Sequence, residues 1–390
     1  MPAFRDNRGL HRLESSHYQT PMAGPSVIDA LRRFLPRFLA SKPGLSAAQW
    51  RAVNAIRQCR TPAMGGHVHA CLDCGQMHFA WHSCNHKACP QCGRAETQQW
   101  VERQLEKLTG APYFMVTFTL PQELRCMFFG ATAKDAFSVF FRAVSTALAE
   151  KLASRQCLGV RVSGFTCVLH TWNQLLLFHP HIHCIVPGVG LRADGTVCCV
   201  KKADFLIHLP LLQAAFKQAF RRELAARDWQ VDPTVWSKTW GVNIQACGSG
   251  VPAIKYLGAY VARTAIADSR IVHIDDNQVT FRWKDRPNGG REETKSLDGV
   301  EFVRRYLRHV LPPKMHTVRH YGFCHPAAKK NRERIQFLTG MTLFIMGNQS
   351  ETPPPEKPAW PCPCCGKPMR LVGSYPREYQ GSCHPRPPPS

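Results

Sequence analysis

The segment HPHIHCIVPG, residues 179–188, alternates histidine with apolar side chains and ends on glycine. Successive side chains of a β-strand point to opposite faces, so that residues two apart share a face. His181 and His183 therefore lie side by side, while Ile182 and Cys184 point the other way, into a core. We expect a strand that presents two imidazoles as a metal clamp. The alternative is a pair of histidines on an exposed strand face.

A divalent ion that acts on phosphate needs a third protein ligand besides this pair and open coordination positions. Gln174 lies seven residues before His181, near the start of the same strand, and we favour it. The alternatives are His170, expected on the neighbouring strand, and His179, which has the parity of His181. Mg²⁺ and Mn²⁺ both suit mixed imidazole and oxygen ligation.

Strands and helices are expected on both sides of the histidine segment. Aromatic and β-branched runs predict strands over residues 113–121, 159–171 and 175–186, and a hairpin over 271–283. Apolar side chains at helical spacing predict helices over residues 27–59, 94–108, 133–152, 209–224, 251–267 and 302–311. Strands and helices without regular alternation favour an α+β fold.

A second chemical signal lies in IKYLGAYVAR, residues 254–263. Tyr256 and Tyr260 are four residues apart and share one face of the expected helix. Arg263 shares that face and Lys255 flanks it, so both are candidate phosphate contacts. Tyrosine acts as a covalent nucleophile when a metal-polarised phosphate or a cation compensates for its pKa of about 10. The alternative is that the two rings simply pack together.

The chain has 18 cysteines, and their setting predicts metal binding rather than disulfides. The N-terminal stretch MPAFRDNRGL lacks the apolar core of a signal peptide, and no apolar run is long enough to span a bilayer. We therefore expect a cytoplasmic protein without a membrane partner. In a reducing compartment clustered cysteines usually hold metal.

Three groups of cysteine and histidine are candidate structural zinc sites. Cys71-x-x-Cys74 and Cys89-x-x-Cys92 are spaced like the two halves of one four-cysteine site. The candidate ligands of a second site are Cys59, His67, Cys84 and His86. The candidate ligands of a C-terminal site are Cys362, Cys365, Cys383 and His384. Metal would order the proline-rich piece around the last group, because that piece offers little core.

The balance of charge points to a polyanionic partner. Lys and Arg number 50 against 27 Asp and Glu, a formal net charge of +23. An excess of this size spread over the whole chain is typical of proteins that bind nucleic acid. The alternative is a basic protein with no such partner.

Several motifs occur together in the order seen in one family. They are the cysteine-rich segment 59–92, His170-Thr-Trp172, His-Pro-His-Ile-His at 179–183, Tyr256-Leu-Gly-Ala-Tyr260 and Arg319-His-Tyr-Gly322. The sequence resembles the insertion sequence 91 family of transposases, of the two-tyrosine HUH rolling-circle type. The resemblance runs from about residue 28 to residue 340 and covers most of the chain.

The resemblance implies transposition through single-stranded DNA at the element ends and the target. One tyrosine would attack a phosphodiester to form a 5′-phosphotyrosine and leave a free 3′-OH, and the second would allow a second cleavage or strand transfer. By position, Tyr256 and Tyr260 would be the nucleophiles and His181 and His183 the ligands of the catalytic metal. A plasmid replication initiator or relaxase, or a zinc-containing DNA-binding protein without catalysis, are the alternatives.

Composition, motifs and resemblance together divide the chain into five parts. We expect an HUH nuclease core, an antiparallel sheet flanked by helices, preceded by a helical and zinc-binding domain. The parts are an arm (1–26), the helical and zinc-binding domain (27–108), the nuclease core (109–270), its C-terminal continuation (271–346) and a proline-rich tail (347–390).

Overall fold

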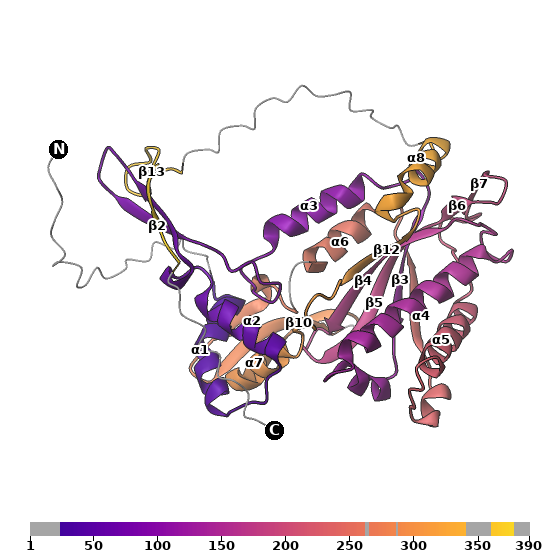
Figure 1. Cartoon of the computed structure of the whole chain (residues 1–390), viewed down its shortest axis with the longest axis horizontal. Helices are drawn as coiled ribbons and strands as arrows, with labels where there is room; N and C mark the ends of the chain where they lie inside the picture. The colour runs from indigo at the N-terminus through magenta and orange to yellow at the C-terminus, as the bar shows by residue number, and fades with distance from the viewer. Residues whose placement is uncertain (1–23, 262–264, 286–287, 341–359, 378–390) are drawn as a thin grey trace.

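The computed structural model describes residues 24–261, 265–285, 288–340 and 360–377 (Figure 1). The helices are α1 (Val27–Ala40), α2 (Ala47–Gln58), α3 (Arg94–Leu105), α4 (Ala133–Ala153), α5 (Leu209–Ala225), α6 (Val251–Val261), α7 (Gly299–Leu307) and α8 (Lys329–Leu338). The strands of the first half are β1 (Gly66–Ala70), β2 (Met77–Trp81), β3 (Tyr113–Thr119), β4 (Gly164–Trp172), β5 (Phe178–Pro187), β6 (Val189–Leu191) and β7 (Val197–Cys199). The later strands are β8 (Gly241–Ala246), β9 (Ile271–Ile274), β10 (Gln278–Asp285), β11 (Arg291–Asp298), β12 (Val318–Gly322) and β13 (Arg370–Tyr375).

The range 27–59, predicted as helical, contains two helices, α1 and α2. Pro43 and Gly44 lie between them, and proline disfavours the helical conformation of the residue before it. Ser26 and Ser46 each begin a helix with a capping box, in which the serine hydroxyl accepts from the backbone of the third helical residue. The helix predicted from residue 302 begins at Gly299 instead, because the Asp298 carboxylate caps it.

The central layer is an antiparallel sheet in the order β12-β4-β5-β3-β8. Helices α4 and α5 cover one face of the sheet, and α3 and α6 cover the other (Figure 1). This confirms the predicted α+β class, with an antiparallel sheet between helices. Strands β8 and β12 had no predicted counterpart, and both lie at edges of the sheet.

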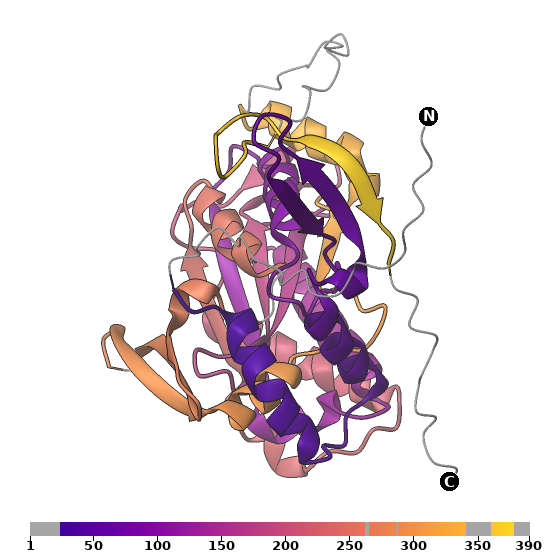
Figure 2. The same ribbon diagram turned by 90° about the vertical axis from the view of Figure 1, so that its left-hand side faces the viewer.

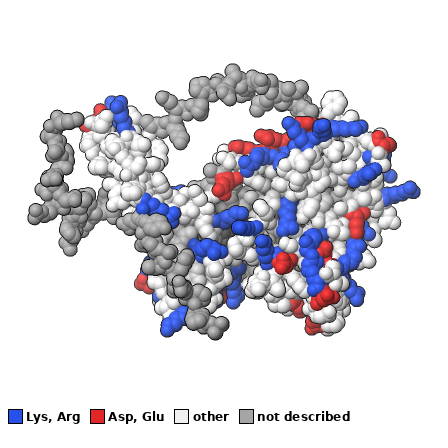
Figure 3. All heavy atoms as spheres, viewed as in Figure 1, with Lys and Arg blue, Asp and Glu red and all other residues white. Residues whose placement is uncertain are grey.

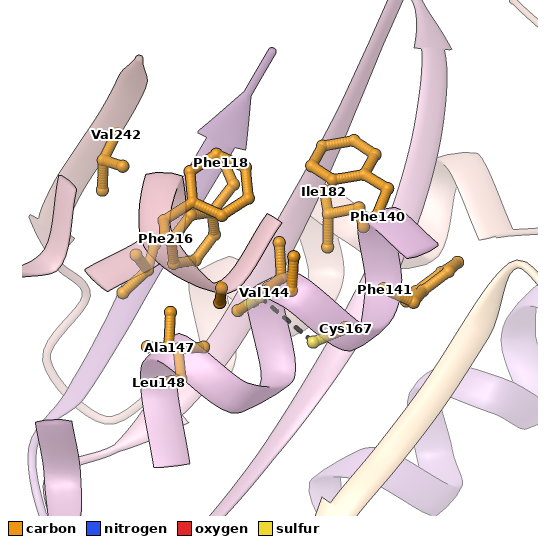
Figure 4. Close-up of a cluster of buried hydrophobic side chains, with 14 of the residues drawn as sticks. Phe118, Phe140, Phe141, Val144, Ala147, Leu148, Cys167, Ile182, Phe216 and Val242 are labelled. Atoms are coloured by element: carbon orange, nitrogen blue, oxygen red, sulfur yellow. Dashed lines mark hydrogen bonds between the residues drawn. The ribbon is translucent and has the colours of Figure 1, made fainter. Parts of the chain in front are cut away.

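The main core lies between the sheet and the pair α4 and α5 (Figure 4). Ile182 and Cys184 of β5 point into it, as their alternation with histidine predicts. Phe140 and Val144 of α4 and Phe216 of α5 meet them from the helix side and are fully buried. The sheet is therefore held firmly on this face, which leaves the opposite face to present the histidines.

A second core lies between the N-terminal helices α1 and α2 and the segment that contains β9, β10, β11 and α7. Helix α1 packs against α7, and the sheet β11-β10-β9 closes the cluster. The segment predicted as a hairpin over 271–283 forms β9 and β10, and β11 extends it by a further strand. Phe34 of α1, Phe281 of β10 and Phe302 of α7 are completely buried in this cluster.

A third, smaller sheet has the order β13-β1-β2, so that the last described strand joins the β1–β2 hairpin near the start of the chain. Strand β13 pairs antiparallel with β1, which pairs antiparallel with β2. Figure 2 shows β13 in yellow beside the indigo strands β1 and β2. Among the described helices none has the length and apolar character needed to cross a membrane.

Candidate active site and metal centres

The pairing of β4, β5 and β3 assembles three histidines on one face of the sheet. His181 of β5 lies opposite His170 of β4, and His183 lies opposite Thr117 of β3. Residues directly opposite each other in a sheet share a face, so these side chains all point toward α6. The ligating atoms of His170, His181 and His183 lie within 4.8 Å of one another, which is close enough for a single ion.

Hydrogen bonds orient two of the three imidazoles. His181 Nδ1 donates to the main-chain oxygen of His179 at 2.7 Å, because a carbonyl can only accept. In the neutral imidazole this hydrogen bond leaves the lone pair of Nε2 available to a metal ion. His183 Nδ1 forms a hydrogen bond of 2.8 Å with Thr117 Oγ1, which holds the second ring. Both rings thus have the outer contact typical of histidines that bind metal.

Burial favours the neutral form of the third histidine. His170 is 4% exposed, and burial, followed by its proximity to His183 and His181, lowers its pKa well below the ordinary value. A neutral imidazole is the form that binds metal. The donor set of three imidazoles fits a divalent ion with open positions for a phosphate oxygen.

The geometry favours His170 over Gln174 as the third ligand. Gln174 follows the end of β4, in the turn before β5, and its main-chain carbonyl accepts from Arg270 Nη2 at 2.5 Å. His179, the other alternative, is hydrogen-bonded through Nδ1 to Arg125 Nη2 at 2.8 Å. Nearness in sequence favours Gln174, whereas antiparallel pairing brings His170 directly opposite His181.

Helix α6 places Tyr256 beside this histidine cluster. The ring centroids of Tyr256 and His183 are 6.3 Å apart, with the ring planes nearly perpendicular, and Tyr256 is 39% exposed. Tyr260 lies four residues further along the same helix, and Lys255 is exposed on it. Arg263 lies outside the described residues. The cluster and an accessible phenol therefore occupy the same face of the sheet.

The predicted zinc site of Cys71, Cys74, Cys89 and Cys92 is wrong, because the structure divides these thiols between two groups. One group is Cys59, Cys84, Cys89 and Cys92, and the other is Cys71, Cys74, Cys362 and Cys365. The hairpin of β1 and β2 causes the division. Cys71 and Cys74 lie in its turn, whereas Cys59 precedes the hairpin and Cys89 follows it. Five-residue strands span about 17 Å, too far for one ion.

Each group has the dimensions of a four-thiolate zinc site. Sγ atoms lie 3.7 Å apart for Cys59 and Cys92, and 3.4 Å apart for Cys71 and Cys365. Thiolates bound tetrahedrally to zinc at about 2.3 Å would lie about 3.8 Å from one another. With four protein ligands such sites are closed and structural.

Of the remaining predicted zinc ligands, the structure describes His67 and His86, and neither is a member of the two groups. His67 is exposed on β1, where its Nδ1 forms a hydrogen bond of 3.3 Å with Ser374 Oγ. His86 accepts from the backbone N–H of Ala88 at 3.1 Å. Cys383 and His384 lie outside the described residues.

Comparison with known proteins identifies the family. The family model described as "Transposase zinc-binding domain" matches residues 30–120, and the one described as "Putative transposase" matches residues 164–332. The "Putative transposase y4qJ" of Sinorhizobium fredii is 36% identical over 330 residues, which cover 77% of this chain and 80% of that protein. The "Transposase for insertion sequence element IS801" of Pseudomonas savastanoi pv. phaseolicola is 26% identical over 304 residues, covering 73% and 72%.

These matches define a transposase with an N-terminal zinc-binding domain. The chain belongs to the insertion sequence 91 family of transposases, as its motifs predict. Two solved structures of the conjugative relaxase TrwC with oriT DNA, one metal-free and one metal-bound, are also similar in part. They are 13% and 12% identical, with TM-scores of 0.28 and 0.27, and cover 50% and 58% of this chain and 71% of each relaxase chain.

Proposed function

We propose that this transposase nicks and rejoins single-stranded DNA at element ends through phosphotyrosine intermediates. The observation that supports the proposal best is the position of Tyr256 beside the cluster of His170, His181 and His183. Tyr256 and His183 are 73 residues apart in sequence, yet α6 holds Tyr256 over the face of the sheet that carries the three histidines. That arrangement suits the transfer of a phosphoryl group to a phenol.

The reaction exchanges one phosphodiester bond for another. The Tyr256 phenol loses its proton and attacks the scissile phosphorus, so that an O–P bond to tyrosine forms. The bond from phosphorus to the 3′ oxygen breaks, and that oxygen leaves as a 3′-OH after taking up a proton. Attack by a 3′-OH on the phosphotyrosine reverses the exchange and releases the phenol. No outside energy source is needed, because the intermediate keeps the phosphodiester.

The residues of the chain orient and hold the reacting groups. His170, His181 and His183 would hold Mg²⁺ or Mn²⁺, which polarises the scissile phosphate when bound. Thr117 and the carbonyl of His179 keep two of the rings in their orientation. Tyr260 would serve as the second nucleophile, and Lys255 and Arg263 would contact the phosphate backbone.

The net charge of +23 suits single-stranded DNA as the partner. Figure 3 shows Lys and Arg spread over one face of the molecule, with smaller groups of Asp and Glu among them. Each nucleotide carries one phosphate charge, so basic side chains that contact the backbone give affinity without sequence preference. We further propose that the protein works in the bacterial cytoplasm, on DNA of the nucleoid.

The test uses labelled single-stranded oligonucleotides that carry the element ends, incubated with the full chain and Mg²⁺ or Mn²⁺. A denaturing gel should show a protein-linked product with the wild type and none with the double variant Tyr256→Phe and Tyr260→Phe. Tyr375→Phe, in the small sheet, is the matched control and should keep the product. A product that persists in the double variant would refute the assignment of nucleophiles, and DNA binding without any nicking would refute the catalytic proposal.

The same assay separates the candidates for the third ligand. His170→Ala should abolish the product, whereas Gln174→Ala should leave most of it. The opposite result would return the third position to Gln174.

A further inference from the structure

We infer that Cys71, Cys74, Cys362 and Cys365 bind a structural zinc ion that attaches the C-terminal segment 360–377 to the N-terminal zinc-binding domain. The two halves of the site come from turns almost 300 residues apart, since 288 residues separate Cys74 from Cys362. The matched family ranges end at residues 120 and 332, so neither includes the second half.

The two turns have the same backbone structure. In CLDCGQ, residues 71–76, Gly75 N donates to Cys71 O at 3.0 Å and Cys71 N donates to Gln76 O at 2.9 Å. In CPCCGK, residues 362–367, Gly366 N donates to Cys362 O at 2.9 Å and Cys362 N donates to Lys367 O at 2.7 Å. Both glycines have a positive φ, 69° and 71°, which closes each turn. Two such matching turns form a pair of zinc knuckles.

The thiols of the two turns meet directly. Cys71 Sγ lies 3.4 Å from Cys365 Sγ, and Cys74 Sγ lies 3.6 Å from Cys362 Sγ. Cys71 and Cys362 are 1% and 2% exposed, so they form the floor of the site. Cys74 and Cys365 lie on its exposed side. Each turn thus contributes one buried and one exposed thiol, as the two equivalent halves of one site would.

The surrounding core is too small to hold this piece without metal. The buried cluster around the turns consists of Cys71, Cys362 and Met369. Burial of a side chain of this size contributes about 2 kcal/mol, far less than the conformational entropy lost on ordering a segment of this length. Binding of zinc by four thiolates supplies free energy of folding in such cases.

Segment 360–377 also supplies β13, the third strand of the small sheet, so the zinc ion would hold that strand in place. Strand β13 pairs with β1 from Arg370 to Tyr375 with one bulge at Val372, and Tyr375 packs edge-on against Trp81 of β2 with ring centroids 5.6 Å apart. Trp360 stacks on His69 of β1 at 5.1 Å. Loss of the ion should therefore release β13 and expose the edge of β1.

The second group of four cysteines should keep its metal when the C-terminal ligands are replaced, so it serves as a control within the same chain. Cys59, Cys84, Cys89 and Cys92 all lie within residues 59–92, so that site needs nothing from the C-terminal segment. Cys364 lies in the same turn as Cys362 and Cys365, is exposed, and is not a member of either group. It is the matched control for replacement of a thiol in this turn.

The experiment measures zinc per full-length chain by mass spectrometry of the metal, after purification in reductant and dialysis. The double variant Cys362→Ser and Cys365→Ser should hold one zinc ion fewer than the wild type, and so should Cys71→Ser with Cys74→Ser. Cys364→Ser should hold as many as the wild type. An unchanged zinc content in the first two variants, or an equal loss in Cys364→Ser, would overturn the inference.

Limited proteolysis guards against a variant that loses metal through general misfolding. The double variant at Cys362 and Cys365 should be cleaved in segment 360–377 at least tenfold faster than the wild type, with the rest of the chain equally resistant. Faster cleavage throughout the chain would show that the loss of zinc reports on global unfolding, and the inference would fail.

Discussion

Gly258 controls how closely the tyrosine helix approaches its neighbour, and Gly258→Ala tests that control. A Cβ at this position would overlap Val101 Cγ2 of α3 and would lie 3.6 Å from Trp100 Cε3. Valine in a helix strongly prefers one rotamer, so Val101 has little freedom to turn away. The two helices must therefore separate, and Tyr256 must move with α6.

The expected magnitude follows from two opposing terms. Alanine in a helix interior is more favourable than glycine by about 1 kcal/mol. Overpacking of a close contact costs about 1–3 kcal/mol. The balance is a loss of about 1 kcal/mol in the free energy of unfolding, which lowers Tm by about 1–2 °C for a chain of this length. Because Tyr256 lies beside the histidine cluster, a displacement of about 1 Å should slow formation of the protein–DNA adduct by about 100-fold.

Thermal denaturation and the rate of adduct formation measure the two effects separately. Val101→Ala in the same chain removes the overlapping methyl group and should restore both Tm and rate. Gly44→Ala is the control, because a Cβ at Gly44 meets nothing within 4 Å. If Gly258→Ala is as stable and as fast as the wild type, or if Val101→Ala rescues neither quantity, the close approach of the helices does not position Tyr256.

Three further predictions follow from single contacts. Thr117→Val removes the hydrogen bond to His183 and should weaken Mn²⁺ binding by about 10- to 100-fold in a titration; unchanged affinity would show that Thr117 does not orient the ring. Burial lowers the pKa of His309 from 6.5 to about 4. As pH falls from about 7 to about 5 the unfolded chain gains a proton that folded His309 does not, so the free energy of unfolding should fall by up to about 2 kcal/mol in urea titrations. His309→Gln should reduce that pH dependence, and an unaltered slope would assign it to other groups. Ser26→Ala removes the cap of α1 and should cost about 1 kcal/mol, and no loss in the same titrations would contradict the capping role.

Local sequence was enough to predict the elements that carry the chemistry. The alternation around His181 and His183 predicts a strand with both imidazoles on one face, and β5 has that form. The spacing of Tyr256 and Tyr260 predicts a helix, and α6 contains both. These predictions depend on the period of side chains along one strand or one helix, which is a property of the covalent chain and its backbone conformation.

Partners that are far apart in sequence could not be assigned in this way. His170 joins the histidine pair because β4 and β5 pair in one register, and shifting that register by one residue would turn His170 to the other face. The choice between His170 and Gln174 was therefore beyond any argument from spacing.

The cysteines show most clearly which features local sequence predicts and which depend on contacts between distant segments. The spacing of two cysteines within one turn was enough to identify each half-site, because a C-x-x-C turn brings its own thiols together. The pairing of half-sites was decided by the β1–β2 hairpin, which separates Cys74 from Cys89, and by β13, which brings Cys362 to Cys74. By itself the sequence determined which residues can bind metal. Only the tertiary structure decided which of them share an ion, because that depends on contacts between segments that chain connectivity leaves independent.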